Sequence, residues 1–257
     1  MAPSPALDPL RGLMDLPGVG PAAAEATAAV DRLLSHHVLR RGSAPVSAES
    51  ALRGARASAA LDGADHPLAV VRAGGGGPVV RGALRVGAEL GRQVDVWLRA
   101  PGQVLAGLHL LAASELVDPD RLGRPRADPE VAGRLAALSA LLVAPSSVPA
   151  VVSAAVVHGE LLTLAPFHGA TGVVARAASR LTLVARGLDP KAVSVPEVGQ
   201  VELADAYADA ATGYATGEPA AVAAWLRHCC ATVVWGAREG LAICEATRRG
   251  GGRAGAG

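Results

Sequence analysis

Residues 165–172, Ala-Pro-Phe-His-Gly-Ala-Thr-Gly, form the short connection on which the expected fold depends. The apolar run from Val148 to Leu164 precedes them, and a second helical pattern follows and ends at Gly187. Glycine suits the left-handed end of a helix, and the glycines of the loop permit a tight turn. We therefore expect two helices joined by this loop, with unpaired N–H groups of the second helix that attract anions.

Helical spacing of apolar residues recurs in segments 47–63 and 219–247, the first with Ser47 as its N-cap. Residues 128–130, Asp-Pro-Glu, are typical of a helix start, because they combine an N-cap, a proline and an acid in the first turn. No segment alternates apolar and polar residues with β-branched enrichment. The sequence predicts an all-α, single-domain helical bundle with at most one short β-hairpin near residues 121–126.

The chain has 257 residues, of which 51% are apolar, so it can bury a substantial core. Charged residues make up 18% and the formal net charge is +1, so no overall field attracts nucleic acid or an acidic membrane. We divide the chain into an N-terminal turn and helix, residues 1–44, a helical domain, residues 45–247, and a tail, residues 248–257. The tail holds only Gly, Arg and Ala and is expected to be disordered.

Ala-Pro-Ser-Pro follows Met1, without the basic and apolar regions of a signal peptide. The apolar run at residues 148–164 is too short for a membrane span and carries a histidine and a glutamate. The cysteines at 229, 230 and 244 have no C-x-x-C spacing and read as reduced core thiols. We therefore expect a cytoplasmic protein that does not associate with membranes.

The stretch from His158 to Arg176 resembles the core of the Fic/Doc (Fido) family, whose loop reads H-P-F-x-[DE]-G-N-G-R-x-x-R. Pro166, Phe167, Gly172 and Arg176 match this pattern. The resemblance covers residues 45–245 and implies a Fic-type helical bundle. It also implies the family's chemistry, in which the loop histidine deprotonates a target hydroxyl that attacks a nucleotide phosphate, commonly of ATP. The loop carboxylate holds Mg²⁺ in that reaction.

Five positions of the loop depart from the family pattern. Ala165 stands in place of the catalytic histidine and Gly169 in place of the metal-binding carboxylate. Ala170 replaces a glycine, Thr171 an asparagine and Val173 the first arginine. The resemblance therefore implies a site without its general base and without its metal ligand. A positioned base contributes about 10²–10⁴-fold to a rate, so its loss alone disables an ordinary member.

Other residues near the loop have assigned roles. His168 is the substitute candidate for the missing base, and the alternative is an exposed loop histidine. His158 is interpreted as a buried packing residue, as the resemblance implies, and Pro166 and Phe167 as structural parts of the loop. His109 is expected to be a satisfied core or groove residue, because no partner lies at metal-ligand spacing.

Phosphate binding could survive these replacements. Thr171, Gly172 and Val173 begin the second helix, and Arg176 offers a guanidinium fork to phosphate or carboxylate, so we assign these four residues to nucleotide or phosphate binding. No catalytic residue and no metal ligand is assigned. ATP and Mg²⁺ are the cofactors that the resemblance implies if activity is retained, and otherwise we expect weak nucleotide binding or none.

Residues 58–63, Ser-Ala-Ala-Leu-Asp-Gly, resemble the inhibitory motif [ST]-x-x-x-E-[GN] of many Fic proteins. Asp62 replaces the usual glutamate between Ser58 and Gly63. In the family this carboxylate pairs with the second loop arginine, here Arg176, and blocks productive nucleotide binding. The shorter aspartate must approach more closely by a methylene length. The alternative is a solvated aspartate at a helix end.

Two further segments allow alternative interpretations. Residues 16–20, Leu-Pro-Gly-Val-Gly, resemble the hairpin of helix-hairpin-helix DNA-binding modules, in which glycine amides hold a phosphate. The alternative is a turn followed by a proline at the start of a helix. Residues 123–126, Gly-Arg-Pro-Arg, lie where the family has a flap for the target peptide, and an ordinary polar loop is the alternative.

These observations predict a Fic-like pseudoenzyme that acts as a binding or regulatory module, with another protein as its expected partner. One alternative is an active nucleotidyl- or phospho-transferase with altered chemistry. A second alternative is DNA binding through the turn at residues 16–20, although the charge balance does not favour nucleic acid. The sequence makes no prediction of oligomeric state.

Overall fold

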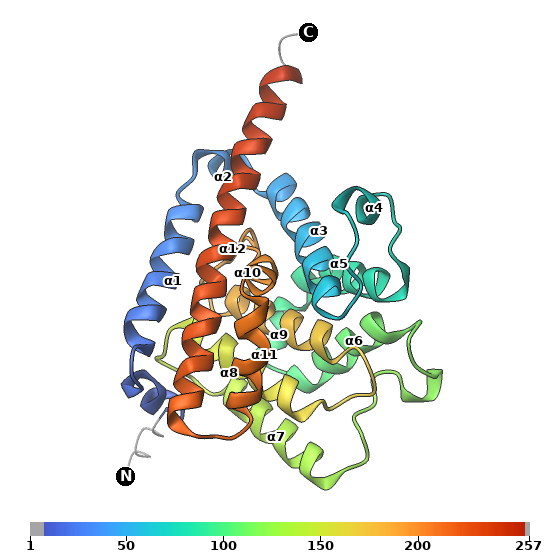
Figure 1. Ribbon diagram of the computed structural model, residues 1–257, viewed down its shortest axis with the longest axis vertical. Helices are drawn as coiled ribbons and strands as arrows, with labels where there is room; N and C mark the ends of the chain where they lie inside the picture. The colour runs from blue at the N-terminus through green and yellow to red at the C-terminus, as the bar shows by residue number, and fades with distance from the viewer. Residues whose placement is uncertain (1–7, 255–257) are drawn as a thin grey trace.

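The computed structural model describes residues 8–254, and this range contains helices and no strand, which confirms the all-α class (Figure 1). Two of the helices, η1 and η2, are short 3-10 helices. In chain order the helices are η1 Arg11–Asp15, α1 Val19–Leu34, α2 His37–Arg41, α3 Ala44–Leu61, α4 Leu68–Arg72, α5 Gly77–Trp97, α6 Pro101–Ala113, η2 Pro119–Arg121, α7 Pro129–Val143, α8 Ala150–Leu164, α9 Thr171–Ala185, α10 Pro196–Glu202, α11 Ala204–Tyr214 and α12 Pro219–Ala254.

Helix α8 is the central element of the fold. Every residue from Val151 to Gly159 is buried, and the helix packs against α9 on one side and α12 on another. A helix that is apolar on most sides is stable only when other helices surround it. The prediction of a buried helix before the loop is therefore confirmed, with its first residue at Ala150.

Two apolar clusters meet at α8. The α12 cluster is formed mainly by α1, α8 and α12, and the α9 cluster mainly by α3, α5, α6, α8 and α9. Each has a fully buried tryptophan whose indole N–H is satisfied. Trp225 donates to the Ala155 carbonyl at 2.8 Å in the α12 cluster, and Trp97 donates to Thr182 Oγ1 at 3.0 Å in the α9 cluster.

Glycines let two pairs of helices approach at the backbone. A Cβ at Gly236 of α12 would lie 2.5 Å from the nitrogen of Pro196, which begins α10. A Cβ at Gly82 of α5 would collide with the main chain of Ala112 in α6. These contacts leave no room for a methyl group, so they fix how closely the helices pack.

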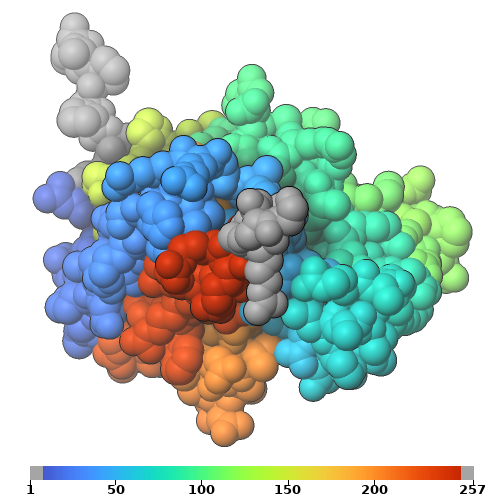
Figure 2. Space-filling view, turned by 90° about the horizontal axis from the view of Figure 1, so that it is seen from above, coloured from blue at the N-terminus to red at the C-terminus, as the bar shows by residue number. Residues whose placement is uncertain are grey.

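The N-terminal helix α1 lies along α12 (Figure 1). Seen from above, the part of α12 drawn in red lies at the surface beside the N-terminal helices, in blue (Figure 2). Asp8 ties the start of the described chain to the α7–α8 loop, because its Oδ2 accepts from Ser147 N at 2.7 Å and Ser146 Oγ at 2.8 Å. The N-terminal segment therefore covers part of the α12 cluster.

The expected start of the third helix was wrong. Helix α3 begins at Ala44, with Pro45 in its first turn, and not after Ser47. Proline needs no N–H partner at a helix start, so Pro45 extends the helix towards the N-terminus. The Ser47 hydroxyl donates instead to the carbonyls of Ser43 and Lys191, at 3.0 and 2.7 Å.

The β-hairpin allowed for near residues 121–126 does not form. This segment holds η2 and irregular chain, and its one main-chain bond to the loop runs from Arg126 N to the Pro166 carbonyl at 2.8 Å. Pro119 and Pro125 have no N–H group, so they cannot contribute to a strand ladder. The segment nevertheless lies against the loop through this bond.

Helix α12 continues to Ala254, into the tail for which we predicted disorder, and residues 255–257 of that tail lie outside the described range. An ion pair between Arg248 and Glu245 at 2.8 Å supports the extension, and an established helix propagates at low cost. In the described range, α12 alone is long and apolar enough to cross a membrane. Most of its apolar window is buried inside the fold, as in a core helix.

Candidate functional site

The loop between α8 and α9 turns through three residues with left-handed backbone. Ala165 ends α8 with φ 42°, Gly169 has φ 72°, and Ala170 caps the start of α9 with φ 52°. Alanine disfavours this conformation because its Cβ approaches the following carbonyl oxygen. The loop therefore keeps a glycine-type shape at two positions that lack glycine, and it brings Thr171 to the first position of α9.

Arg126 holds the beginning of the loop. Its guanidinium donates from Nε to the Ala165 carbonyl and from Nη2 to the Leu164 carbonyl, both at 2.9 Å. The last carbonyls of a helix have no partner within the helix, and a cation at this end also suits the helix dipole. Arg126 therefore stabilises the end of α8 from the segment at residues 121–126.

His109 of α6 joins the loop to the same segment. Its ring is fully buried and stacks on Phe167, with centroids 4.6 Å apart. Gly123 N donates to Nδ1 at 3.0 Å, so in the neutral ring Nε2 carries the proton and donates to the His168 carbonyl, also at 3.0 Å. Burial lowers the pKa of His109 and favours this neutral form.

Arg176 joins α9 to the last turn of α3. Its guanidinium is buried and donates from Nε to Ser58 Oγ at 2.9 Å, and from Nη2 to the Ser58 carbonyl at 2.8 Å and to Asp62 Oδ1 at 2.6 Å. Helix α3 ends directly after this contact, where Gly63 takes the left-handed conformation with φ 84°. The structure thus brings together the arginine and the aspartate that the sequence comparison paired.

The Asp62 carboxylate stands over the start of α9. A Cβ at Gly172 would collide with Asp62 Oδ1 and would lie 2.8 Å from each terminal nitrogen of Arg176. The side chain of Asp62 is 24% exposed, so one face of the carboxylate still meets solvent. An acid at this end of a helix is favourable, because the helix dipole is positive there.

No family model and no curated protein sequence matches the chain. Among solved structures, a Fic family protein from Desulfovibrio desulfuricans G20 matches with a TM-score of 0.74 and 18% identity, over 88% of this chain and 74% of that one. Fic-1 from C. elegans, residues 134–508, matches with a TM-score of 0.69 and 17% identity, over 89% of this chain and 73% of that one. The chain has the Fic fold. At these identities the likeness shows the fold and does not assign roles to individual residues.

Within the Fic fold, the base position gains no partner that could replace a histidine. Ala165 presents only a methyl group, and the His168 imidazole makes no hydrogen bond to any described residue. The interaction that His168 makes is through its main-chain oxygen, which accepts a hydrogen bond from His109 Nε2. A base must lie within hydrogen-bond reach of the proton that it removes, so His168 stays a candidate on sequence grounds alone.

Behind Arg176, the Fic fold holds a polar network that the sequence did not indicate. The Tyr207 hydroxyl lies 2.9 Å from His158 Nε2, and Gln200 Nε2 lies 3.5 Å from His158 Nδ1. Burial lowers the pKa of His158 well below its usual value, and the charge of Arg176 adds to this shift. His158 is thus a neutral residue in the core, as expected. No spacing signal connects it to Tyr207, which follows 49 positions later.

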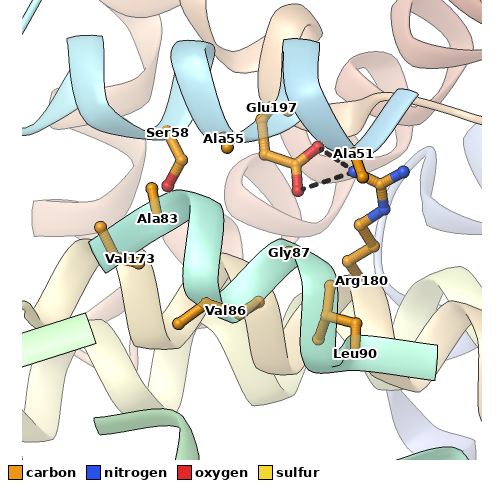
Figure 3. A pocket seen from close by; sticks show the side chains of 12 residues that line it. Ala51, Ala55, Ser58, Ala83, Val86, Gly87, Leu90, Val173, Arg180 and Glu197 are labelled. Carbon is orange, nitrogen blue, oxygen red and sulfur yellow. Dashed lines mark hydrogen bonds and ion pairs between the residues drawn. The ribbon is translucent and has the colours of Figure 1, made fainter. Parts of the chain in front are cut away.

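A buried ion pair lies against the middle of α3, beside Gly54 (Figure 3). Arg180 Nη1 of α9 is 3.4 Å from Glu197 Oε2 of α10, and both side chains are buried. The adjoining cavity, also lined by Val173, has a volume of about 20 Å³, room for one water molecule. Val173 is 3% exposed, so the place of the first family arginine is a packed apolar position.

The residues around Gly172 do not fit a magnesium-bound nucleotide in this arrangement of the Fic fold. Gly169 has no side-chain oxygen for a metal ion, and the charge of Asp62 repels a phosphate at the start of α9. The described residues contain no group of three or more His, Cys, Asp or Glu side chains arranged for a metal ion. The phosphate-binding roles of Thr171, Gly172, Val173 and Arg176 therefore stay predictions.

The turn at residues 16–20 packs against α12. Gly18 has φ 76° and caps α1, and Arg227 Nη1 of α12 donates to the Pro17 carbonyl at 2.7 Å. The aliphatic part of Arg227 lies 3.0 Å from the place of a Cβ at Gly18. The structure thus gives this turn a packing role, and the DNA-binding alternative stays a prediction.

Proposed function

We propose that the chain is a Fic-fold pseudoenzyme, without nucleotidyl transfer to protein hydroxyls, that acts as a binding or regulatory module for another protein. The position of the Asp62 carboxylate over Gly172, where it pairs with Arg176, supports this proposal most strongly. It puts a negative charge where transfer requires a phosphate.

The loop itself gives a second line of support. Ala165 cannot accept a proton, and Gly169 cannot hold a metal ion. Phosphoryl-type transfer depends on positioning and on charge neutralisation, to which a metal ion contributes several kcal/mol. These groups act as a unit, so the loss of both leaves little catalysis. A role that depends on binding, with no transfer, is consistent with these losses.

Transfer is tested with the purified full chain, labelled ATP and Mg²⁺. We expect no label on the chain itself or on proteins of its native host. Labelling that disappears in Arg176→Lys, with an unchanged melting temperature, would contradict the proposal. Arg176→Lys keeps the buried charge but cannot make the three hydrogen bonds of the guanidinium.

Calorimetry with ATP separates a blocked site from an absent one. Asp62→Ala removes the carboxylate over Gly172, and we expect ATP affinity to increase about tenfold or more over the wild type. Asp65→Ala is the matched control, because Asp65 is 68% exposed and pairs with Arg56 instead of Arg176. Equal affinities in both variants would show that Asp62 does not block the site.

A loop with the family residues restored tests whether their absence prevents magnesium-dependent binding of ATP. Ala165→His, Gly169→Asp and Thr171→Asn restore three family residues at partly exposed positions, while Val173→Arg would bury a charge and is omitted. Combined with Asp62→Ala, these changes should give magnesium-dependent binding of ATP. Tight magnesium-dependent binding by the unmodified chain would instead support the alternative of a transferase with altered chemistry.

A further inference from the structure

A cavity of about 380 Å³ shares no lining residue with the ion pair at Asp62 and lies where the described chain begins. It is lined by η1 and the segment before it, by α7 and α8, and by the α11–α12 turn, all near the lower end of the view in Figure 1. Ligand pockets range from about 300 to 1,000 Å³, so this cavity can enclose a small molecule.

Its polar wall is an ordered arrangement of charges. Glu160 of α8 accepts from Arg134 Nη2 of α7 at 2.8 Å through Oε2, and from the Tyr214 hydroxyl of α11 at 2.9 Å through Oε1. Burial and the neighbouring Glu160 raise the pKa of Tyr214, so its hydroxyl stays protonated and donates. The three side chains hold one another in fixed positions before any ligand arrives.

The charged pair keeps unused bonding capacity. Arg134 uses only Nη2 in a hydrogen bond to a described residue, since its Nη1 lies 3.9 Å from the nearest Glu130 oxygen. Each Glu160 oxygen accepts one hydrogen bond and can accept another. The side chains of Arg134 and Glu160 are 35% and 28% exposed, and both line the cavity. The wall thus offers donors and acceptors side by side.

Apolar side chains form another part of the lining. Leu10 and Leu13 come from the start of the described chain, Val156 from α8 and Val222 from α12. A ligand with one apolar end can bury that end here while its polar end meets the charged pair. Because the lining holds one positive and one negative side chain, a ligand with a single charge is attracted by one of them and repelled by the other.

We propose that this cavity binds a free apolar α-amino acid. The carboxylate of the amino acid accepts from Arg134, its ammonium group donates to Glu160, and its side chain packs against the leucines and valines. A zwitterion matches the neutral sum of the lining charges, and both contacts are charge-assisted hydrogen bonds. The cavity shares α8 with the candidate site but none of that site's residues, so this proposal does not depend on the proposed function.

Calorimetry on the full chain tests the proposal with L-leucine and L-phenylalanine as probes. We expect saturable binding of at least one of them at millimolar concentration or below. Leucinamide lacks the carboxylate and N-acetyl-leucine lacks the ammonium group, so each should bind at least about tenfold more weakly. Glycine, which lacks the apolar side chain, should bind more weakly as well. Equal binding of leucine and N-acetyl-leucine, or no saturable binding of either amino acid, would overturn the proposal.

Variants locate the binding. Glu160→Gln keeps the shape of the side chain and removes its charge, and it should weaken leucine binding at least about tenfold. Val222→Trp fills the cavity from the apolar side and should have a similar effect without touching the charges. Arg92→Gln, at an arginine 79% exposed on α5, is the control and should bind normally. Unchanged binding in Val222→Trp and Glu160→Gln would place the amino acid elsewhere and overturn the proposal.

Discussion

Ala170 adopts a backbone conformation that glycine adopts freely, at the position where the family has glycine. The left-handed conformation costs an alanine about 1–2 kcal/mol, whereas glycine costs about 0.5–1 kcal/mol in the entropy of the unfolded chain. We therefore expect Ala170→Gly to leave stability unchanged or to raise it by up to about 1 kcal/mol.

The control for Ala170→Gly is Ala132→Gly, at an exposed position within α7, which should lower stability by about 1 kcal/mol. Chemical denaturation of both variants measures the difference. Similar losses in the two variants would mean that Ala170 carries no strain.

His109 predicts a dependence of stability on pH. Burial lowers its pKa in the folded state, while the unfolded chain keeps a value of about 6.5. As the pH falls below about 6.5, this histidine takes up a proton in the unfolded chain before it does so in the folded chain. The contribution of His109 to stability is therefore complete above that pH and is lost as the pH falls towards the pKa of the folded state. His158 and His228 shift in the same direction through burial. The free energy of unfolding should therefore fall as the pH is lowered from about 7.5 to about 5.

The variant His109→Gln isolates the contribution of this histidine. Glutamine can accept from Gly123 and donate to the His168 carbonyl, but it takes up no proton. The decline of stability with acid should be shallower in the variant, and the protection of the Gly123 amide against hydrogen exchange, relative to the intrinsic rate at each pH, should fall less with acid than in the wild type. A decline as steep as that of the wild type would exclude His109 as a source.

Individual loop residues could be predicted where their neighbours in the chain define their surroundings. Pro166, Phe167, Gly172 and Arg176 fit a local pattern, and Asp62 fits a second one. The hydrogen bonds of His109 could not be predicted in the same way, because its partners lie 14 and 59 positions away. A buried histidine on an apolar helix shows that some polar partner exists, but not which one.

For the helices too, local features could be predicted from the sequence, whereas contacts between distant segments could not. Apolar spacing and end signals located α8 and α9, and Asp128 caps α7 by accepting from Glu130 N at 2.8 Å, as the Asp-Pro-Glu sequence indicates. The pairing of α10 with α12 and of α1 with α12 had no such signal. Pairing depends on shape and on backbone contacts between distant segments, and a single sequence does not contain that information directly.

The glycine contact between α10 and α12 gives a prediction about helix packing. Gly236→Ala adds a methyl group that would lie 2.5 Å from Pro196 N, so α10 must move away from α12. Overpacking of this kind typically costs about 1–3 kcal/mol, which outweighs the gain in helix propensity. Thermal denaturation should show a clearly lower melting temperature.

Gly133→Ala provides the matched comparison. Gly133 is exposed on α7 and has no atom within 4 Å of an added Cβ, so the same substitution should stabilise the chain by about 0.5–1 kcal/mol. If both variants were equally stable, the approach of α10 to α12 would not limit the packing.

The whole molecule should unfold in one step, because α8 contributes to both apolar clusters. Trp97 reports on the α9 cluster and Trp225 on the α12 cluster. Two variants isolate these signals: one keeps Trp97 alone and the other keeps Trp225 alone, with the remaining tryptophans replaced by phenylalanine. Their fluorescence transitions should coincide with the loss of helical circular dichroism in the same variant. Separate transitions would divide the chain into two domains.

The contact between Arg176 and Ser58 limits how the site can be opened. One of its two hydrogen bonds ends on the main-chain oxygen of Ser58, so no substitution of the Ser58 side chain removes that acceptor. A ligand that displaces only the Asp62 carboxylate would leave Arg176 bound to Ser58 through both of these hydrogen bonds. Separation of α3 from α9 would break them, and it would act against the ion pair that holds Arg53 of α3 to Glu239 of α12 at 2.5 Å.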